Sequence, residues 1–194
     1  MVRKREFDEE KALDAAMQIF WEKGYNATSL SDLTVHMGIQ RPSLYSAFGD
    51  KENLFEAALR KYTKLHATEI RKKLLQNNRS VKEAIRLLFE DLVESGYKEG
   101  QSMGCFCINT MVELAPHDEK FEILTREHQM YLSVIFQEII VEGIRSGELD
   151  SSLNAKALAQ TLVVSLIGLT VMMKSRPERS FVDNSVSMIV SLIK

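Results

Sequence analysis

The sequence predicts an all-α protein, on three observations. The 194 residues include only three prolines and nine glycines, so long stretches contain nothing that interrupts a helix. Apolar residues recur three and four positions apart along most of the chain, which is helical spacing. No segment shows the alternation of apolar and polar residues that is typical of a strand. We therefore expect about nine helices with short connections.

Composition and charge restrict the function. The content of 45% hydrophobic and 27% charged residues is typical of a soluble globular protein. The net charge is −2, and residues 1–65 hold ten Lys and Arg against ten Asp and Glu, so any binding to nucleic acid depends on individually placed cations. The N-terminus has no apolar signal core, and the apolar stretch 162–173 is shorter than the roughly 20 residues that span a bilayer. We expect a cytoplasmic protein with no membrane partner.

The first predicted helix begins after Asp8 and ends at Gly24. Aspartate is a favoured N-cap because its carboxylate accepts hydrogen bonds from free amides of the first turn, and glycine readily adopts the left-handed conformation at a C-cap. The basic arm Arg3 to Arg5 precedes this helix. One interpretation of this arm is a solubilising start without structure. The apolar face of the helix is formed by Leu13, Ala16, Met17 and Phe20.

The next two predicted helices are short and are joined by a glycine. Ser29 begins the second helix, with Asp32 three residues later as a weak form of the capping box. Gly38 gives the tight turn that follows. Pro42 lies in the first turn of a third helix, residues 41–48, where its missing N–H is not needed. The apolar residues that would bury this corner against the first helix are Leu30, Leu33, Met37, Ile39, Leu44 and Phe48.

The remaining helices form a connector and a second domain. A fourth helix, capped by Asp50, runs to about Leu75, and polar residues 77–80 then interrupt the apolar pattern. We expect a helix-turn-helix domain over residues 1–55, a connector over 50–75, and a second helical domain over 76–194. The helices predicted in this second domain cover 81 to about 96–100, 105–114, 117 to about 146, 154–174 and about 178–193.

The outward face of the third helix differs from an ordinary solvated face, which usually carries Glu and Lys. It is small and polar, with one cation and one aromatic hydroxyl. A helix that reads a DNA groove needs hydrogen-bond donors that approach base edges and phosphates closely. The alternative is a two-helix corner that serves packing alone. The residues of this face are Gln40, Arg41, Ser43, Tyr45, Ser46 and Ala47.

Residues 10–56 resemble the DNA-binding domain of the TetR family of transcriptional regulators, over about a quarter of the chain. The resemblance implies a homodimer whose third helices enter successive major grooves of a near-palindromic operator, with half-sites ~34–36 Å or a multiple apart. It also implies a repressor that a small effector or thiol modification releases from double-stranded DNA. The residues that carry it are Ala15, Ala16, Phe20, Gly24, Tyr25, Thr28, Ser29, Met37, Gly38, Ile39, Ser43, Leu44, Tyr45, Phe48, Lys51, Leu54 and Phe55.

The resemblance also implies roles for individual side chains. Arg41 would pair with guanine, and Pro42 would contact a thymine methyl group. The residues implied to face base edges are Gln40, Arg41, Pro42 and Ser43. The residues implied to contact phosphates are Thr28, Ser29, Tyr45, Ser46 and Lys51.

Two other classes of function compete with the regulator. One is an enzyme that carries this corner, and the other is a helical adaptor whose corner binds protein. The sequence has no glycine-rich phosphate loop, nucleophile elbow or His-Glu-x-x-His pattern, so we expect neither enzymatic activity nor a cofactor.

The helix predicted over residues 154–174 is apolar nearly all round, and such a helix must be covered on every face. One side can pack inside its own domain, while the other needs a partner. A two-fold dimer, with the last two helices of each chain in a four-helix interface, is the simplest account. The alternative is that both are core helices of a monomer. The residues expected at the interface are Leu158, Leu162, Leu166, Leu169, Val186, Ile189, Val190 and Ile193.

The second domain is also where the resemblance places an effector. Methionine and aromatic side chains are candidate walls of a pocket, although residues of these types at helical spacing more often form core. The candidates are Phe89, Met103, Phe106, Met111, Phe121, Tyr131, Phe136 and Met172.

Cys105 and Cys107 are the only cysteines. On one helix their thiols would point about 200° apart, so we expect no disulfide or shared metal between them. Each is a small buried hydrophobe, or one is a thiol that senses an oxidant or electrophile. Residues 104–114 resemble a TetR branch with quinone- and aldehyde-responsive members. His117 and His128 match no metal-ligand spacing, so we expect no metal.

Overall fold

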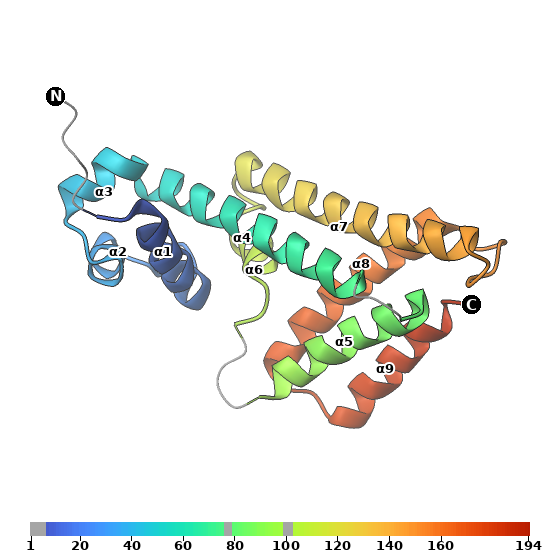
Figure 1. Cartoon of the computed structure of the whole chain (residues 1–194). Helices are drawn as coiled ribbons and strands as arrows, with labels where there is room; N and C mark the ends of the chain where they lie inside the picture. The colour runs from blue at the N-terminus through green and yellow to red at the C-terminus, as the bar shows by residue number, and fades with distance from the viewer. Residues whose placement is uncertain (1–6, 76–78, 99–102) are drawn as a thin grey trace. The chain divides into compact units, whose positions relative to one another are not determined.

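The structure, a computed structural model, describes residues 7–75, 79–98 and 103–194. The arm Arg3 to Arg5 lies outside the described residues. Within them the chain forms nine α-helices, one 3-10 turn and no strand, so the all-α prediction is confirmed (Figure 1). The helices are α1 (Glu9–Lys23), α2 (Leu30–Met37), α3 (Arg41–Phe48), α4 (Lys51–Leu74), α5 (Val81–Tyr97), α6 (Phe106–Glu113), α7 (Glu119–Arg145), α8 (Ala155–Met172) and α9 (Arg179–Ser191), with the turn η1 (Met173–Ser175) after α8.

The chain packs as two units. Unit 1 comprises Met1–Lys64 and Cys105–Thr125, and unit 2 comprises Leu65–Gly104 and Arg126–Lys194. Helices α4 and α7 each contribute one end to each unit. Because residues 105–125 belong to unit 1, helix α6 packs with the helix-turn-helix segment, although it lies in the sequence range predicted for the second domain. The domain boundaries predicted from the sequence, at residues 55 and 76, stay a prediction.

Unit 1 is built around an aromatic cluster. Phe55 of α4 is fully buried, and its ring meets those of Phe20, Tyr25, Phe106 and Phe121 edge to face or nearly so. The centroid distances run from 4.8 to 5.3 Å. Rings in this arrangement attract one another beyond their burial. The cluster therefore joins α1, the turn that follows it, α4, α6 and the start of α7.

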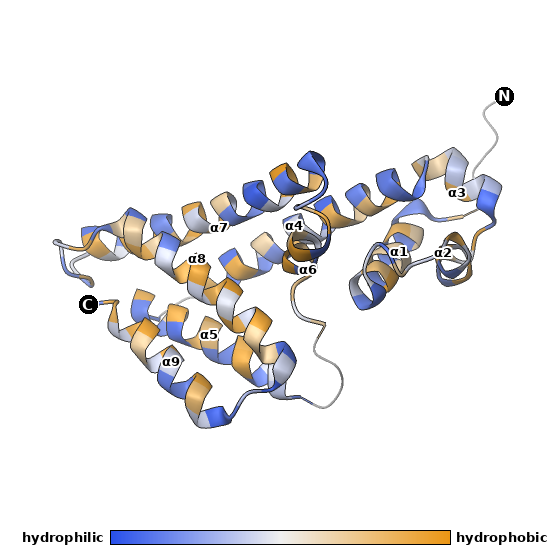
Figure 2. Ribbon diagram, turned by 180° about the vertical axis from the view of Figure 1, so that it is seen from behind, coloured by the Kyte–Doolittle hydropathy of each residue, from blue (hydrophilic) through white to orange (hydrophobic). Residues whose placement is uncertain are grey.

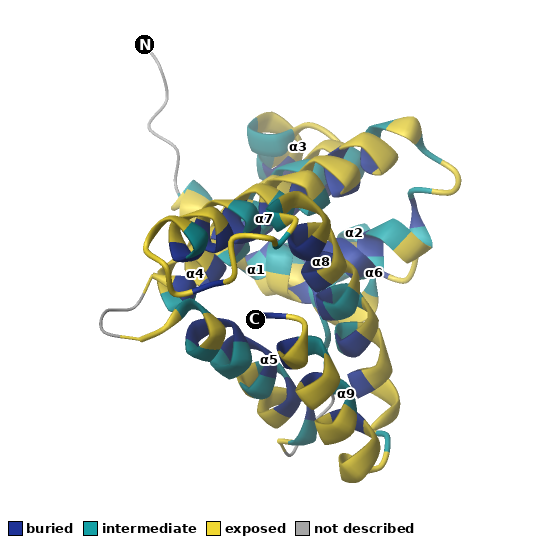
Figure 3. Cartoon of the chain, turned by 90° about the vertical axis from the view of Figure 1, so that its right-hand side faces the viewer, coloured by how far each residue is buried: buried dark blue, intermediate teal, exposed yellow. Residues whose placement is uncertain are grey.

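Unit 2 is a second, separate core. It is formed by α5, α8 and α9 with the ends of α4 and α7, and its buried residues lie on the sides of these helices that face one another (Figure 3). Gly96 allows α5 to approach the end of α8, because a Cβ added there would lie 2.7 Å from the Cε of Met173. Figure 2 shows α8 as mostly apolar, whereas α4 and α7 mix apolar and polar residues.

The interface predicted on α8 and α9 needs correction. Seven of the eight predicted residues are buried in the core of unit 2, and the eighth, Ile189, packs against that core. Buried side chains of a single subunit cannot also form the surface that a partner covers. The exposed apolar side chains of the same helices are instead Val164, Val171 and Met172 on α8 and Phe181 and Met188 on α9.

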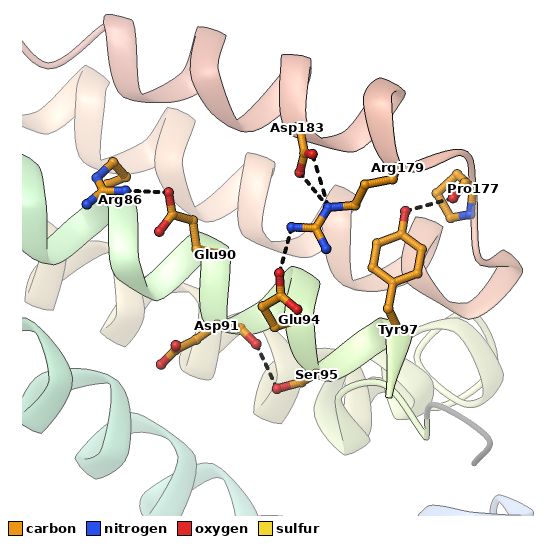
Figure 4. A network of polar contacts seen from close by, with 9 residues as sticks. All are labelled: Arg86, Glu90, Asp91, Glu94, Ser95, Tyr97, Pro177, Arg179 and Asp183. Atoms are coloured by element: carbon orange, nitrogen blue, oxygen red, sulfur yellow. Dashed lines mark hydrogen bonds and ion pairs between the residues drawn. The ribbon is translucent and has the colours of Figure 1, made fainter. Parts of the chain in front are cut away.

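A polar network fastens α5 to the start of α9 (Figure 4). Arg179 donates to Glu94 at 2.6 Å and to Asp183 at 2.8 Å, and the Tyr97 hydroxyl donates to the carbonyl oxygen of Pro177 at 2.7 Å. The ion pairs are about half exposed, so they orient the helix more than they stabilise it.

One helical segment of the described chain, Ala155–Ser175, is long and apolar enough to cross a membrane by length and composition. The core helix of a soluble protein meets the same criterion. Leu158, Leu162 and Leu166 of this segment are buried inside unit 2.

Candidate nucleic-acid interface

Helices α2 and α3 are set by local signals in the sequence. Ser29 and Asp32 form a complete capping box: the Ser29 side chain accepts from Asp32 N, and the Asp32 carboxylate accepts from Ser29 N. The hydrogen bond from Lys23 holds the pKa of Asp32 well below its usual range, so this carboxylate stays charged. Gly38 ends α2 at φ +64°, in the left-handed region, and its amide donates back to the helix.

Helix α3 presents the polar face that the sequence predicted. Leu44 is fully buried, whereas Tyr45 keeps 49% of its surface exposed. Between Asp32 and Asp50 the sequence contains no acidic residue, so no carboxylate of this segment opposes a phosphate. The predicted base-facing and phosphate-facing residues of α3 and its N-cap that are exposed are Gln40, Arg41, Pro42, Tyr45 and Ser46, with Ser43 partly buried.

Arg41 links the two short helices. Its Nη2 donates to the hydroxyl oxygen of Ser31 on α2 at 2.9 Å, and both residues are exposed. Because this hydrogen bond is exposed to water, replacing it with a hydrogen bond to a guanine edge would cost little free energy. Arg41 is the first residue of α3, and the N-terminal residues of a recognition helix are the ones that contact base edges.

The structure gives Thr28 a role other than the predicted phosphate contact. Thr28 is 1% exposed, and its hydroxyl donates to the carbonyl oxygen of Gly24 at 2.6 Å. A buried hydroxyl cannot reach a phosphate, so this part of the prediction is wrong. The exposed Ser29 hydroxyl donates to Asp32 at 2.6 Å, so its predicted phosphate contact requires this hydrogen bond to be exchanged.

Lys51 stands at the first position of α4, as the prediction of a phosphate contact requires. Its ammonium lies 4.3 Å from the centroid of the Tyr25 ring. Partial burial lowers the pKa of Lys51, while the carboxylate of Glu113 opposes that effect. The phosphate contact stays a prediction, and the stacking on Tyr25 fixes where the charge lies.

Two residues that were not predicted from the sequence support the α1–α2 turn and the start of α4. Glu113, at the end of α6, accepts from Tyr25 N at 3.0 Å and from Asn26 N at 2.8 Å. Lys120 of α7 pairs with Glu52 at 2.5 Å and with Glu56 at 3.4 Å on α4. Partners that lie 64 to 88 positions apart leave no periodic signal in a single sequence, so only the fold reveals them.

The two cysteines begin α6. Cys105 is its N-cap in an extended conformation, with φ −99° and ψ 127°, and Cys107 lies inside the helix. The expected angle of 200° assumed two helical positions, so that geometry was wrong. Both thiols are buried, and burial raises the pKa of Cys107 far above its usual value. A protonated thiol is a poor nucleophile, so burial disfavours reaction at Cys107.

The eight candidate pocket residues do not share one environment. Phe106, Met111 and Phe121 belong to unit 1, and the other five belong to unit 2. The four phenylalanines are buried, whereas Tyr131 and Met172 are exposed. A cavity of about 130 Å³ in unit 2 is lined by none of the eight, and its walls are Arg71, Leu75, Ile135, Glu138, Ile139 and Glu142.

A histidine pair lies in unit 2, with His128 buried and His66 partly buried. The Nδ1 of His66 and the Nε2 of His128 are 3.1 Å apart, so one ring donates and the other accepts. Burial lowers the pKa of each ring to about 4, and both are therefore neutral at pH 7. Among the described residues no group of three or more potential metal ligands occurs.

Family models match both parts of the chain. Residues 12–58 match the model described as bacterial regulatory proteins, tetR family, and residues 81–185 match a tetracyclin repressor-like C-terminal domain. The second match alone covers more than half of the sequence. The first includes α2, α3 and the start of α4, which are the elements that build the polar face.

Similar proteins agree with these matches. The chain is 31% identical over 194 residues to the uncharacterized HTH-type transcriptional regulator YezE of Bacillus subtilis (strain 168), with full coverage of both. It is 30% identical over 169 residues to the HTH-type transcriptional repressor ComR of Escherichia coli (strain K12), covering 87% of this chain and 80% of that one.

A solved structure extends the likeness to the fold. A cysteine mutant of the TetR family transcriptional regulator CifR, in complex with 26-base-pair operator DNA, superposes with a TM-score of 0.85. It is 30% identical, and the match covers 99% of this chain and 100% of that one. The chain therefore belongs to the TetR family of bacterial transcriptional regulators.

Proposed function

We propose that this protein is a cytoplasmic repressor that binds a near-palindromic operator as a homodimer and leaves it when an effector binds. The observation that carries the proposal is the exposed, acid-free face of α3, from Gln40 to Ser46. Arg41 on this face reads guanine, and the neighbouring hydroxyls meet phosphates. The operator complex of the similar CifR mutant supports double-stranded DNA as the partner.

The homodimer is proposed to form through the outer faces of α8 and α9. Val164 and Met188 keep 69% and 67% of their surfaces exposed, and they are the most exposed apolar side chains of the two helices. Two recognition helices must be presented with two-fold symmetry to read a palindrome. Val164→Glu and Met188→Glu should each shift the protein from dimer to monomer in analytical ultracentrifugation, while Lys156→Glu, on the exposed surface of α8, should not.

Release is proposed to follow a population shift. An effector that binds the non-operator conformation more tightly withdraws protein from DNA, and the coupling must be reciprocal. The effector is a small molecule or a reagent for the thiols of Cys105 and Cys107, and the cysteine mutations of the CifR mutant support the second source. The proposal includes no catalytic activity, cofactor or metal.

Selection of fragmented genomic DNA by the immobilised protein tests the function. We expect one short palindrome to persist against excess competitor DNA, with affinity that falls steeply as salt rises. Retention of every fragment alike, or of none, contradicts the repressor. If the protein instead retains a partner protein through α3 and no DNA, the helical adaptor is the correct alternative.

A further inference from the structure

The turn between α1 and α2 is held by a carboxylate from the end of α6. Tyr25 N donates to Glu113 Oε2 at 3.0 Å, and Asn26 N donates to Oε1 at 2.8 Å. One side chain therefore satisfies two consecutive amides of a turn 87 and 88 residues away in the sequence. Hydrogen bonds to an ionised acceptor are roughly twice as strong as neutral ones.

The backbone of the turn is shaped to admit this carboxylate. Gly24 has φ +82°, and a Cβ added there would lie 2.7 Å from Glu113 Oε2, closer than real contacts allow. Lys51 attracts Glu113 electrostatically and stacks on the ring of Tyr25. The glycine, the two amides and the cation all fit the presence of a carboxylate at this point.

The α1–α2 turn also determines where α2 begins. Its last buried residue, Thr28, donates to Gly24, and Ser29 then caps α2. Helix α2 carries Ser31, which accepts from Arg41 of α3. A continuous series of contacts thus runs from Glu113 through the turn to the side chain proposed to read guanine.

We propose that Glu113 is a positioning residue for operator binding, which ties the orientation of α2 and α3 to the position of α6. The proposal rests on the proposed function and names the residue that ties α6 to the DNA-binding helices. Helix α6 has eight residues and is therefore about 12 Å long, with Cys105 and Cys107 at one end and Glu113 at the other. A displacement of α6 at its thiol end withdraws the carboxylate from the turn.

Amide hydrogen exchange tests the contact without DNA. In Glu113→Ala the amides of Tyr25 and Asn26 should exchange at least about tenfold faster, because they lose both acceptors. Glu113→Gln keeps one acceptor and should show an intermediate effect. Glu119→Gln removes an exposed carboxylate of unit 1 and is the matched control, with no change at either amide. Unchanged exchange in Glu113→Ala contradicts the contact.

Operator affinity tests the positioning role, with the palindrome selected by the wild-type protein as the probe. Affinities are measured at a temperature at which circular dichroism shows every variant fully folded. Glu113→Ala should bind the palindrome at least about tenfold more weakly, while its affinity for unrelated DNA changes less than about twofold. Glu113→Gln should lie between, and Glu119→Gln should match the wild type.

The outcomes separate the two proposals. If the wild type selects a palindrome and Glu113→Ala binds it equally well, Glu113 is a structural residue only and the proposed repressor stands. A loss for specific and unrelated DNA alike overturns the positioning role in the same way. If the wild type selects no sequence, the proposed function fails and the role of Glu113 fails with it.

Discussion

The two turns of the helix-turn-helix segment are held by different means. The turn between α2 and α3 is local: Gly38 supplies the left-handed residue, and nothing lies within 4 Å of where its Cβ would be. The turn between α1 and α2 depends on Glu113, which comes from α6 and leaves no room for a side chain at Gly24. The α2–α3 turn is therefore fixed by its own sequence, while the α1–α2 turn responds to the rest of unit 1.

On the proposed function, this difference would separate the reading of DNA from its regulation. A recognition helix needs a constant relation to the helix before it, and a local turn provides one. A switch needs a joint that another element can loosen, and a long-range contact provides that. The predictions that follow test this difference, from the largest expected effect to the smallest.

The largest effect is expected from Phe55→Ala. The ring of Phe55 joins Tyr25 of the α1–α2 turn to Phe106 and Phe121, so its removal loosens that turn and α6 together. Loss of a fully buried phenylalanine costs about 3–5 kcal/mol, measurable as a lower urea midpoint. Val112→Ala, at an exposed site on α6, should change stability by less than about 0.5 kcal/mol. Equal effects of the two variants contradict the cluster.

Acid should weaken unit 2 through its histidine pair. The folded pKa of His66 and of His128 is about 4, below the ordinary 6.5, so the folded state binds fewer protons than the unfolded state between these values. Stability is therefore complete above pH 6.5 and is lost as the pH falls toward 4, by on the order of 3 kcal/mol for each ring. Urea unfolding from pH 7.5 to pH 4.5 measures this loss.

Substitution of the pair provides the control for that pH dependence. His128→Gln should reduce the dependence of stability on pH, because a neutral amide does not titrate, while His66 continues to contribute. His117→Gln, at an exposed position in unit 1, should leave it unchanged. The same slope in His128→Gln and in the wild type would mean that other groups account for the acid sensitivity.

The two turns can be compared directly by placing alanine at each glycine. Gly38→Ala should cost about 1 kcal/mol, from the positive φ alone. Gly24→Ala should cost more, about 2–3 kcal/mol, because Gly24 has φ +82° and ψ 173°, a region essentially restricted to glycine, and because the added Cβ meets Glu113 Oε2. In the Glu113→Ala background the clash is gone, so Gly24→Ala should then cost less than in the wild type, although its backbone strain still makes it costlier than Gly38→Ala. Additive effects of Gly24→Ala and Glu113→Ala would contradict the close approach.

A smaller effect is expected from Lys51→Ala on DNA binding. Lys51 is predicted to contact phosphate and not bases, so affinity should fall by the same factor for every sequence, with a salt slope lower by about one. Lys72→Ala, at an exposed site on α4 in unit 2, is the matched control and should leave affinity unchanged. A changed sequence preference in Lys51→Ala would mean that Lys51 reads bases.

The helix-turn-helix segment was predictable because its signals are local. Each signal acts within one helical turn of the helix end that it marks. The structure shows these signals in the predicted places: Ser29 with Asp32, Gly38, and Pro42. Thr28 was the exception, because exposure of a side chain at the start of a helix depends on what packs over it. The contacts of Glu113 required the whole fold.

The second domain was less predictable, for reasons of geometry. A helix that is apolar all round gives no periodic signal to distinguish its inner from its outer face, so Leu162 and Leu166 were assigned to the interface although they lie in the core. A shift of one residue in where α6 begins removed the expected angle between Cys105 and Cys107. Pocket residues could not be inferred from residue type alone.

The most direct test of the central claim, that α3 reads an operator, is the sequence preference of Arg41→Ala on a library of randomised operators. Arg41→Ala should lose about 1–3 kcal/mol on the best operator and relax the preference at one base pair in each half-site, symmetrically. Arg60→Ala, at an exposed position on α4, should leave the preference unchanged. An unaltered preference in Arg41→Ala, or uniform weakening across all sequences, would contradict the account.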